Sequence, residues 1–169
     1  GPEYSRSIKS IVDESKSLID RGSKEIVLLG QNVNAYNFKD EKNIVYNISK
    51  LIDEVSKLDN IKRIRYTTSH PNNMDLELIK LHGSNEKLMP FLHLPVQSGS
   101  NEVLKKMNRK YNIDEYKKII DQLRLYKPNI EISSDFIVGF PGETNSDFES
   151  TLDLVDYVKF KQSYSFIYS

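Results

Sequence analysis

Short apolar runs of strand length alternate with longer amphipathic stretches along this chain, and this alternation restricts the fold more than any other feature. Strands are expected near residues 25–30, 63–68, 89–94, 130–138 and 163–168. Helical segments between successive strands predict a parallel sheet with right-handed crossovers. Two architectures are compatible with this order: an open doubly wound sheet, or part of a (β/α) barrel. A chain that opens with a helix and closes on a strand is expected to be part of something larger.

Several segments repeat apolar residues at helical spacing, beginning near residues 8, 45, 76, 100, 112 and 144. Asn112 followed by Glu115 is a capping-box-like start signal, and Pro128 ends that helix. The helix before the second strand is expected to face inward with Val45, Ile48, Leu51, Ile52, Val55 and Leu58. The last helix is expected to face inward with Phe148, Thr151, Leu152 and Val155. The polar stretch 37–43 is expected to be an exposed loop.

Composition excludes several classes of protein. Lys and Arg number 24, as do Asp and Glu, so the chain has no electrostatic footprint for nucleic acid, and any main phosphate contacts must lie elsewhere. The chain has no cysteine, which excludes disulfides and thiolate metal sites within it. No stretch approaches the ~20 apolar residues of a membrane span, and the first residues lack a signal-peptide core. The cytoplasm is the expected location.

Polar side chains gather where the predicted strands end. Parallel α/β folds place their chemistry at the carboxyl ends of strands. Four such ends carry hydrogen-bonding groups on Gly- or Pro-shaped loops, namely 29–34, 67–71, 93–100 and 135–144. Lysines are absent from these ends; Lys24 and Lys62 precede their strands. This weakens the alternative of a conventional (β/α)-barrel enzyme for a phosphorylated metabolite.

Each of these residues also has a purely structural interpretation. Gln31, Asn32 and Asn34 are acceptable turn residues, and Ser69 is suited to cap a helix. Arg109 is compatible with a solvated helix end.

Structural and functional roles are also possible for His70, His93 and Asp135. His70 and His93 lack an obvious third ligand for a metal site, and a structural role for His93 inside its strand is favoured. Asp135 is harder to dismiss, because a carboxylate within an apolar run is costly to bury without partners. Gly139 and Gly142 suit a plain turn and also permit close approach of backbone to a ligand.

The strings GPEYSR, LLGQNVNAY, TTSHP, HLPVQSGS, SSDFIVGFPGET and SYSFIYS, taken together, resemble the radical S-adenosylmethionine (SAM) methylthiotransferases over essentially the whole chain. The resemblance implies an α/β fold: a partial (β/α) radical SAM barrel of parallel strands with outer helices, truncated at its first strand. Residues 1–169 would be a partial radical SAM core domain. The cluster-binding CxxxCxxC loop, the N-terminal methylthiotransferase domain and the C-terminal TRAM domain of the family would lie outside it.

The resemblance also assigns cofactor-binding roles residue by residue. Gly30, Gln31 and Asn32 match the strand end that meets the amino end of SAM, and Ser69 matches a position near its methionine or ribose portion. Gln97 matches a residue that reaches the ribose or methionine part of SAM. Arg109 matches the basic residue that binds the carboxylate of SAM. Asp135 matches the carboxylate that binds the ribose hydroxyls. Ile137, Gly139 and Phe140 match the segment whose backbone groups lie along the adenine of SAM. No catalytic residue and no metal ligand is assigned.

The strings most resemble the family members that methylthiolate isopentenyl-adenosine in tRNA next to the anticodon. This implies SAM as cofactor, with two 4Fe–4S clusters in the full-length enzyme and neither ligated by this chain. Implied partners are tRNA, mainly through other domains, and an electron donor such as flavodoxin or ferredoxin, with no membrane. Alternatives within the family act on threonylcarbamoyladenosine in tRNA or on a ribosomal protein. A non-catalytic scaffold or RNA-binding module is the remaining alternative.

Overall fold

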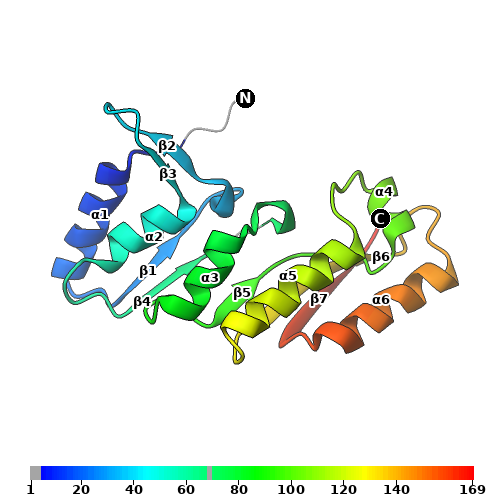
Figure 1. Cartoon of the computed structure of the whole chain (residues 1–169). Coiled ribbons are helices and arrows are strands. Elements are labelled where there is room, and N and C mark those ends of the chain that lie inside the picture. Colours follow the sequence, from blue (N-terminus) through cyan, green and yellow to red (C-terminus); the bar gives the residue numbers. More distant parts are fainter. Residues whose placement is uncertain (1–4, 68–69) are drawn as a thin grey trace.

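The computed structural model of this protein describes residues 5–67 and 70–169, in which helices and strands alternate along most of the chain (Figure 1). The helices are α1 (Ile8–Asp20), α2 (Ile48–Ser56), α3 (Leu76–Ser84), α4 (Asn101–Lys106), α5 (Ile113–Tyr126) and α6 (Asn145–Val158). The strands are β1 (Glu25–Leu28), β2 (Asn37–Lys39), β3 (Val45–Asn47), β4 (Arg63–Tyr66), β5 (Phe91–His93), β6 (Glu131–Val138) and β7 (Gln162–Ile167). Two 3₁₀ turns, η1 (Val33–Ala35) and η2 (Pro71–Asn73), follow β1 and β4.

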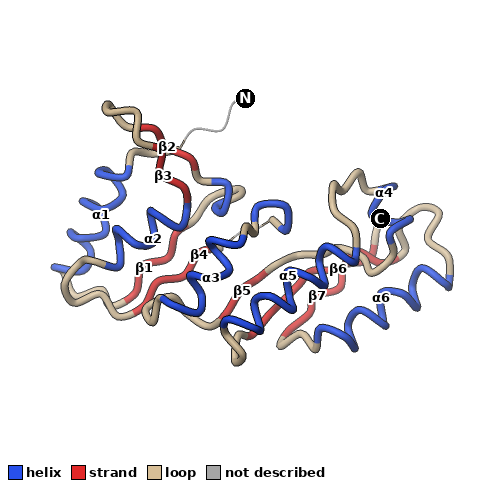
Figure 2. Tube along the Cα trace, viewed as in Figure 1, coloured by secondary structure: helices blue, strands red, loops and turns tan. Residues whose placement is uncertain are grey.

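The main strands form a parallel sheet in the order β1-β4-β5-β6-β7. Strand β1 pairs with β4, and β6 pairs with both β5 and β7, all in parallel. The segment just before β5 joins the two groups, because Ile64 N donates to Lys87 O at 2.7 Å and Met89 N donates to Ile64 O at 2.8 Å. Figure 2 shows the strands as one band that runs the length of the molecule. The parallel strands predicted from the sequence are confirmed.

Helices cover one face of this sheet. Adjacent helices contact each other in chain order, α1 with α2, α2 with α3 and α3 with α5. Alternate residues along β1, β4, β5 and β6 point toward them and are buried, as Ile26 and Leu28 do on β1 and Ile64 and Tyr66 on β4. Within the described residues, no helix is long and apolar enough to cross a membrane.

The face opposite the helices is called here the open face. Its side chains are mostly half-buried on β1, β4 and β5 and exposed on β7, and many are polar. They include Glu25 on β1, Arg65 on β4, His93 on β5, Asp135 on β6 and Tyr164 on β7. Every residue of β7 is exposed, so this strand forms an uncovered edge of the sheet.

The stretch 37–43 is the expected loop only in its second half, because residues 37–39 form strand β2. Strands β2 and β3 form an antiparallel hairpin in which Phe38 pairs with Tyr46. Asp40 closes its turn, because Oδ1 accepts from Lys42 N at 2.8 Å and from Ile44 N at 2.9 Å. The expectation was wrong for residues 37–39 because the polar composition masked a turn that the aspartate side chain holds together.

Two helical predictions also need correction. Val45 lies in β3, and α2 starts only after Asn47, whose side chain accepts from Lys50 N. In α6, Phe148 is 42% exposed and Leu152 is 48% exposed, although both were expected to face inward. Thr151 is buried and Val155 is half-buried, as expected, and the buried stripe continues through Leu154 and Val158.

The start and end of α5 are confirmed. The Asn112 side chain accepts from Glu115 N at 2.8 Å and donates to its carboxylate at 3.0 Å. The helix ends at Tyr126, two residues before Pro128.

Candidate functional site

The loop after β5 holds Gln97 in an unusual conformation. Its φ is +76°, a left-handed value that costs a residue with a side chain about 1 kcal/mol or more. Two hydrogen bonds hold it there: Gln97 N donates to Asp135 O at 3.0 Å, and Ile137 N donates to Gln97 O at 2.9 Å. Because such strain persists only where the surroundings impose it, and clusters at functional sites, Gln97 is a strong site candidate.

Two buried tyrosines fix the backbone between the end of β5 and Gln97. The Tyr111 hydroxyl donates to Val96 O at 2.8 Å, and the Tyr116 hydroxyl donates to Leu94 O at 2.7 Å. Burial raises the pKa of Tyr111 to about 12, so its hydroxyl stays protonated and remains a donor. These tyrosines carry no sequence signal beyond helix periodicity, and the sequence analysis missed their role.

The end of the same loop docks on α6. Gly99 N donates to Thr151 Oγ1 at 2.8 Å, and a Cβ on Gly99 would lie 2.4 Å from Thr151 Cα. Ser100 Oγ donates to Asp147 Oδ1 at 2.7 Å. Hydrogen bonds from the Thr144 backbone and from Ser100 lower the pKa of Asp147, which keeps it an acceptor. The loops after β5 and β6 therefore form one rigid unit.

Asp135 lies on the open face beside His93. Its Oδ2 is 3.3 Å from His93 Nε2, and His93 Nδ1 is 2.6 Å from Ser133 Oγ. The Asp135 side chain is 31% exposed, so the carboxylate is accessible as well as partnered. Within the described part of the chain, its other oxygen makes no hydrogen bond. That oxygen is available to a ligand.

The loop after β6 presents accessible backbone. Gly139 has a φ of +70°, and a Cβ there would meet nothing within 4 Å, so the space beside it is open. Phe140 N donates to Glu143 Oε2 at 3.2 Å, and the ring of Phe140 packs edge-on against Tyr168 at 5.1 Å. Ile137 is half-buried at the start of this loop. Glu143 was not identified from the sequence, although it shapes the loop.

The loops after β1 and β4 are tied together by asparagines. Asn34 is buried; its amide donates to His70 O at 2.9 Å and its oxygen accepts from His70 N at 3.1 Å. Asn32 Nδ2 donates to Asn73 Oδ1 at 2.9 Å. Asn32 and Asn34 are thus connectors between loops rather than ordinary turn residues. Ser69 lies outside the described residues.

Arg109 carries a buried donor without a partner among the described residues, its Nε. Burial and the neighbouring Arg109 charge lower the pKa of His70, whose ring packs edge-on against Tyr111 at 5.7 Å. Buried polar groups are nearly always hydrogen-bonded in folded proteins. A forked guanidinium with an unused donor is suited to an anionic ligand such as a carboxylate.

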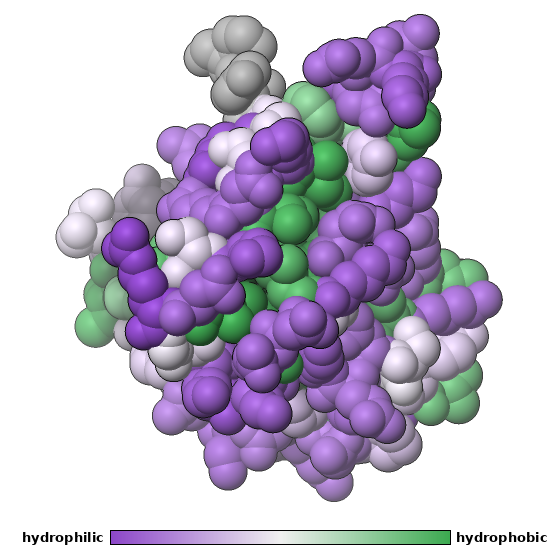
Figure 3. All heavy atoms as spheres, turned by 90° about the vertical axis from the view of Figure 1, so that its left-hand side faces the viewer, coloured by the Kyte–Doolittle hydropathy of each residue, from purple (hydrophilic) through white to green (hydrophobic). Residues whose placement is uncertain are grey.

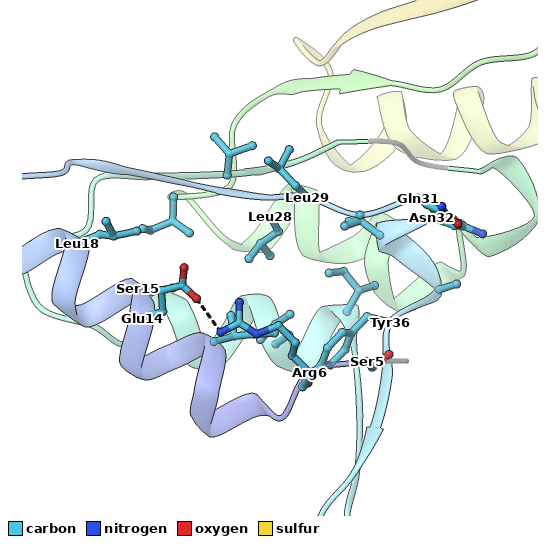
Figure 4. A pocket seen from close by; sticks show the side chains of 18 residues that line it. Ser5, Arg6, Glu14, Ser15, Leu18, Leu28, Leu29, Gln31, Asn32 and Tyr36 are labelled. Carbon is cyan, nitrogen blue, oxygen red and sulfur yellow. Dashed lines mark hydrogen bonds and ion pairs between the residues drawn. The ribbon is translucent and has the colours of Figure 1, made fainter. Parts of the chain in front are cut away.

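A cavity lies to one side of these groups, between α1, β1, η1 and α2. It has a volume of about 650 Å³, and Gly30, Gln31 and Asn32 line one part of it. Figure 4 shows Gln31 and Asn32 at the end opposite the ion pair of Arg6 and Glu14, which are 2.6 Å apart. Figure 3 looks at the α1 end of the molecule and shows apolar surface sunk between hydrophilic side chains.

The predicted site residues therefore fall into separate groups. Gln97, Asp135 and Ile137 are joined by direct backbone hydrogen bonds. Arg109 lies with His70 and Tyr111, and Gly30 to Asn32 lie at the cavity, which neither Gln97, Arg109 nor Asp135 lines.

The two histidines lie in separate hydrogen-bond networks. Among the described residues, no group of three His, Cys, Asp or Glu side chains is placed to hold a metal ion. His70 Nδ1 accepts from Asn72 N at 3.2 Å, whereas His93 is engaged by Ser133 and Asp135. The structural role favoured for His93 therefore fits its hydrogen bonds.

Several related proteins are identical to this chain at more than half of the matched positions. Proteins named tRNA-2-methylthio-N(6)-dimethylallyladenosine synthase match it at 57% identity in Ehrlichia canis, 56% in Wolbachia pipientis subsp. Culex pipiens and 54% in Rickettsia akari. Each match covers all 169 residues of this chain and 38% of the relative. The chain thus spans well under half the length of these relatives.

The fold is similar to a solved structure, that of the apo, selenomethionine-labelled cobalamin-dependent S-adenosylmethionine radical enzyme OxsB. The TM-score is 0.62 at 11% identity, over 88% of this chain and 22% of that one, which shows likeness of fold alone. This agrees with the expected partial barrel of parallel strands. Residues 1–155 match the family described as the radical SAM superfamily. By this match over most of its length, and by a fold consistent with it, the chain belongs to the radical SAM superfamily.

Proposed function

We propose that this chain is the radical SAM core of an enzyme that methylthiolates N6-isopentenyladenosine in tRNA, next to the anticodon. The observation that carries the proposal is identity of 54–57% across all 169 residues to synthases named for that product. Because the chain spans 38% of those relatives, the complete activity is proposed for a longer protein. Residues 1–169 would be its partial core domain, beside a methylthiotransferase domain and a TRAM domain.

The residues at the carboxyl ends of the strands fit SAM. The accessible Asp135 carboxylate suits the ribose hydroxyls, and the Arg109 guanidinium, whose Nε has no partner among the described residues, suits the amino-acid carboxylate. Gln97 is held beside Asp135, where it suits the ribose or methionine part of SAM. The open backbone near Gly139 suits the edge of adenine. Gly30 to Asn32, and Ser69 by its motif, complete the proposed set. SAM supplies the radical chemistry of this superfamily, and the protein positions it.

The residues present do not fit an iron–sulfur cluster. Members of the superfamily use 4Fe–4S clusters, which cysteine thiolates hold, and this chain has no cysteine. Its hard oxygen ligands are not a substitute for soft thiolates. Both clusters of the proposed enzyme are therefore assigned to ligands outside this chain.

The proposed partners follow from the proposed reaction. The tRNA would be held mainly by other domains, since 24 basic residues are balanced by 24 acidic ones here. An electron donor such as flavodoxin or ferredoxin, and a cytoplasmic location, complete the proposal.

The test is nucleoside analysis of tRNA. The gene for the longer protein that contains this chain is expressed in a bacterium lacking its own isopentenyladenosine methylthiotransferase. Liquid chromatography with mass spectrometry is expected to show 2-methylthio-N6-isopentenyladenosine, and an Asp135→Ala variant is expected to lower its amount. Methylthiolation confined to threonylcarbamoyladenosine or to a ribosomal protein would establish one of the family alternatives instead.

A further inference from the structure

We infer that His93 is a positioning residue that holds the Asp135 carboxylate in one orientation for the ligand. The inference rests on the proposed function, because it takes Asp135 as a SAM contact. It assigns a role to a histidine for which the sequence alone favoured no more than a structural one.

The pairing of β5 with β6 brings the side chains of Ser133, His93 and Asp135 together. In the parallel pairing of β5 with β6, His93 lies opposite Ser133, and Asp135 follows Ser133 on the same face. His93 Nδ1 is 2.6 Å from Ser133 Oγ, and Nε2 is 3.3 Å from Asp135 Oδ2. Tyr164, which pairs with Asp135 across β6 and β7, packs its ring edge-on against His93 at 6.4 Å. The imidazole is therefore held at both nitrogens and on one side.

The hydrogen bonds select one tautomer of the neutral ring. An ionised Asp135 only accepts, so Nε2 carries the hydrogen and donates to Oδ2. Nδ1 is then an acceptor and receives the hydroxyl hydrogen of Ser133. Ser133 is 1% exposed, so it cannot readily exchange this partner for water. The order of donation runs from Ser133 through His93 to Asp135.

The same three residue types form the nucleophilic triad of serine hydrolases, but this arrangement is the reverse. In those triads the serine bonds Nε2 and the aspartate bonds Nδ1. Here Ser133 bonds Nδ1 and is buried, while Asp135 bonds Nε2 and is the accessible member. The accessible group is thus an acceptor of hydrogen bonds, as recognition of hydroxyl groups requires, and not a nucleophile.

The consequence is a carboxylate with Oδ2 engaged by His93 and a second oxygen that has no hydrogen-bond partner among the described residues. His93 occupies Oδ2, and the adjacent backbone is held by the bond from Gln97 N to Asp135 O at 3.0 Å. A side chain fixed before binding loses less conformational entropy when the ligand arrives. Removing the imidazole leaves Asp135 in place and chemically intact, but free to rotate.

The test compares variants in the longer protein that contains this chain, with SAM affinity measured by anaerobic calorimetry. His93→Leu is expected to weaken binding roughly three- to tenfold, the worth of one hydrogen bond. His93→Gln, whose amide can still donate toward Oδ2, is expected to recover most of the affinity. Phe91→Leu, two residues earlier on the same face of β5, is the matched control and should bind as the unaltered protein does.

A double-mutant cycle separates positioning from a general structural effect. Asp135→Asn is expected to weaken binding, and adding His93→Leu to it should cost little more, because the group that His93 positions is already altered. At a pH where the ring is neutral, two-bond nitrogen–proton spectra of histidine-labelled protein, with His93→Gln to assign the signal, should show the Nε2–H tautomer of His93. Ser133→Ala should shift that signal.

The outcomes distinguish the two proposals. If Asp135→Asn weakens SAM binding while His93→Leu does not, the inference about His93 is wrong and the proposed site stands. Equal losses in His93→Leu and His93→Gln, or additive losses in the cycle, would also overturn it. If Asp135→Asn leaves the affinity unchanged, the placement of Asp135 in the site fails, and the role of His93 fails with it.

Discussion

The backbone amide of Gln97 donates a hydrogen bond to the carbonyl oxygen of Asp135 at 3.0 Å, which joins a candidate ligand residue in the loop after β5 to one in strand β6. Ile137 N returns a bond to Gln97 O at 2.9 Å, so the loop after β5 continues the sheet beyond its last regular pair. The strained φ of Gln97 is a result of this bridge. The site is thus built on sheet geometry rather than on free loops.

Replacing Gln97 by glycine should separate stability from binding. At a φ of +76°, glycine removes a steric cost, so the free energy of unfolding should rise by about 0.5–1 kcal/mol. SAM binding should weaken, because the side-chain amide is lost. Gln97→Ala is the matched control: it removes the amide but keeps the strain. Urea denaturation and calorimetry measure the two effects, and a Gln97→Gly variant less stable than Gln97→Ala would contradict the argument.

Stability should fall as the pH drops from 6.5 toward 4, because of His82. Burial, with a smaller effect of the Lys127 charge, lowers the pKa of His82 from 6.5 to about 4 in the folded chain. Between these values the unfolded chain binds a proton that the folded chain does not, so up to about 3 kcal/mol is lost. Above pH 6.5 this contribution is fully present.

Denaturation of the chain at a series of pH values measures this effect. His82→Gln should flatten the dependence between pH 4 and 6.5, although it also lowers stability because His82 Nε2 is 2.6 Å from the Tyr66 hydroxyl. An unchanged slope in that variant would assign the dependence to another group.

Gly99→Ala should destabilise the docked loop. An added Cβ would lie 2.4 Å from Thr151 Cα and 2.5 Å from Ser150 O, which are backbone atoms of α6 and cannot move aside independently. Forcing them apart is expected to cost about 1–3 kcal/mol. Gly139→Ala is the control, because its Cβ would meet nothing within 4 Å and only its φ of +70° opposes the change. Thermal unfolding should rank Gly99→Ala below Gly139→Ala.

The chain alone should not assemble an iron–sulfur cluster. After anaerobic reconstitution with iron and sulfide it should remain colourless and form no 5′-deoxyadenosine from SAM, because it lacks cysteine. A protein extended upstream through a CxxxCxxC loop should become brown and cleave SAM when reduced. Iron retained stoichiometrically by the chain alone after desalting would refute this prediction, and an upstream extension without cysteines would leave the proposed function unsupported.

Local patterns were enough to predict the order of the elements and the limits of some of them. Parallel strands follow from apolar runs separated by helices, and the start of α5 follows from Asn112, whose capping partner is three residues away. The edge of the sheet that carries the candidate site follows from the same order, since all parallel strands end on one side. These features depend on neighbours close in sequence or on topology.

Tertiary structure alone decided the details that depend on distant partners. The buried stripe of α6 includes Thr151, whose hydroxyl accepts a bond from Gly99 N, 52 residues away, whereas Phe148 and Leu152 are exposed. The pairing of His93 with Asp135 spans 42 residues and depends on the register between β5 and β6. Residue types and periodicity indicate which face of a strand a side chain lies on, but they do not indicate which side chain of the neighbouring strand lies opposite it. Register and packing make that choice, because they are set by the free energy of the whole fold and not by any one segment.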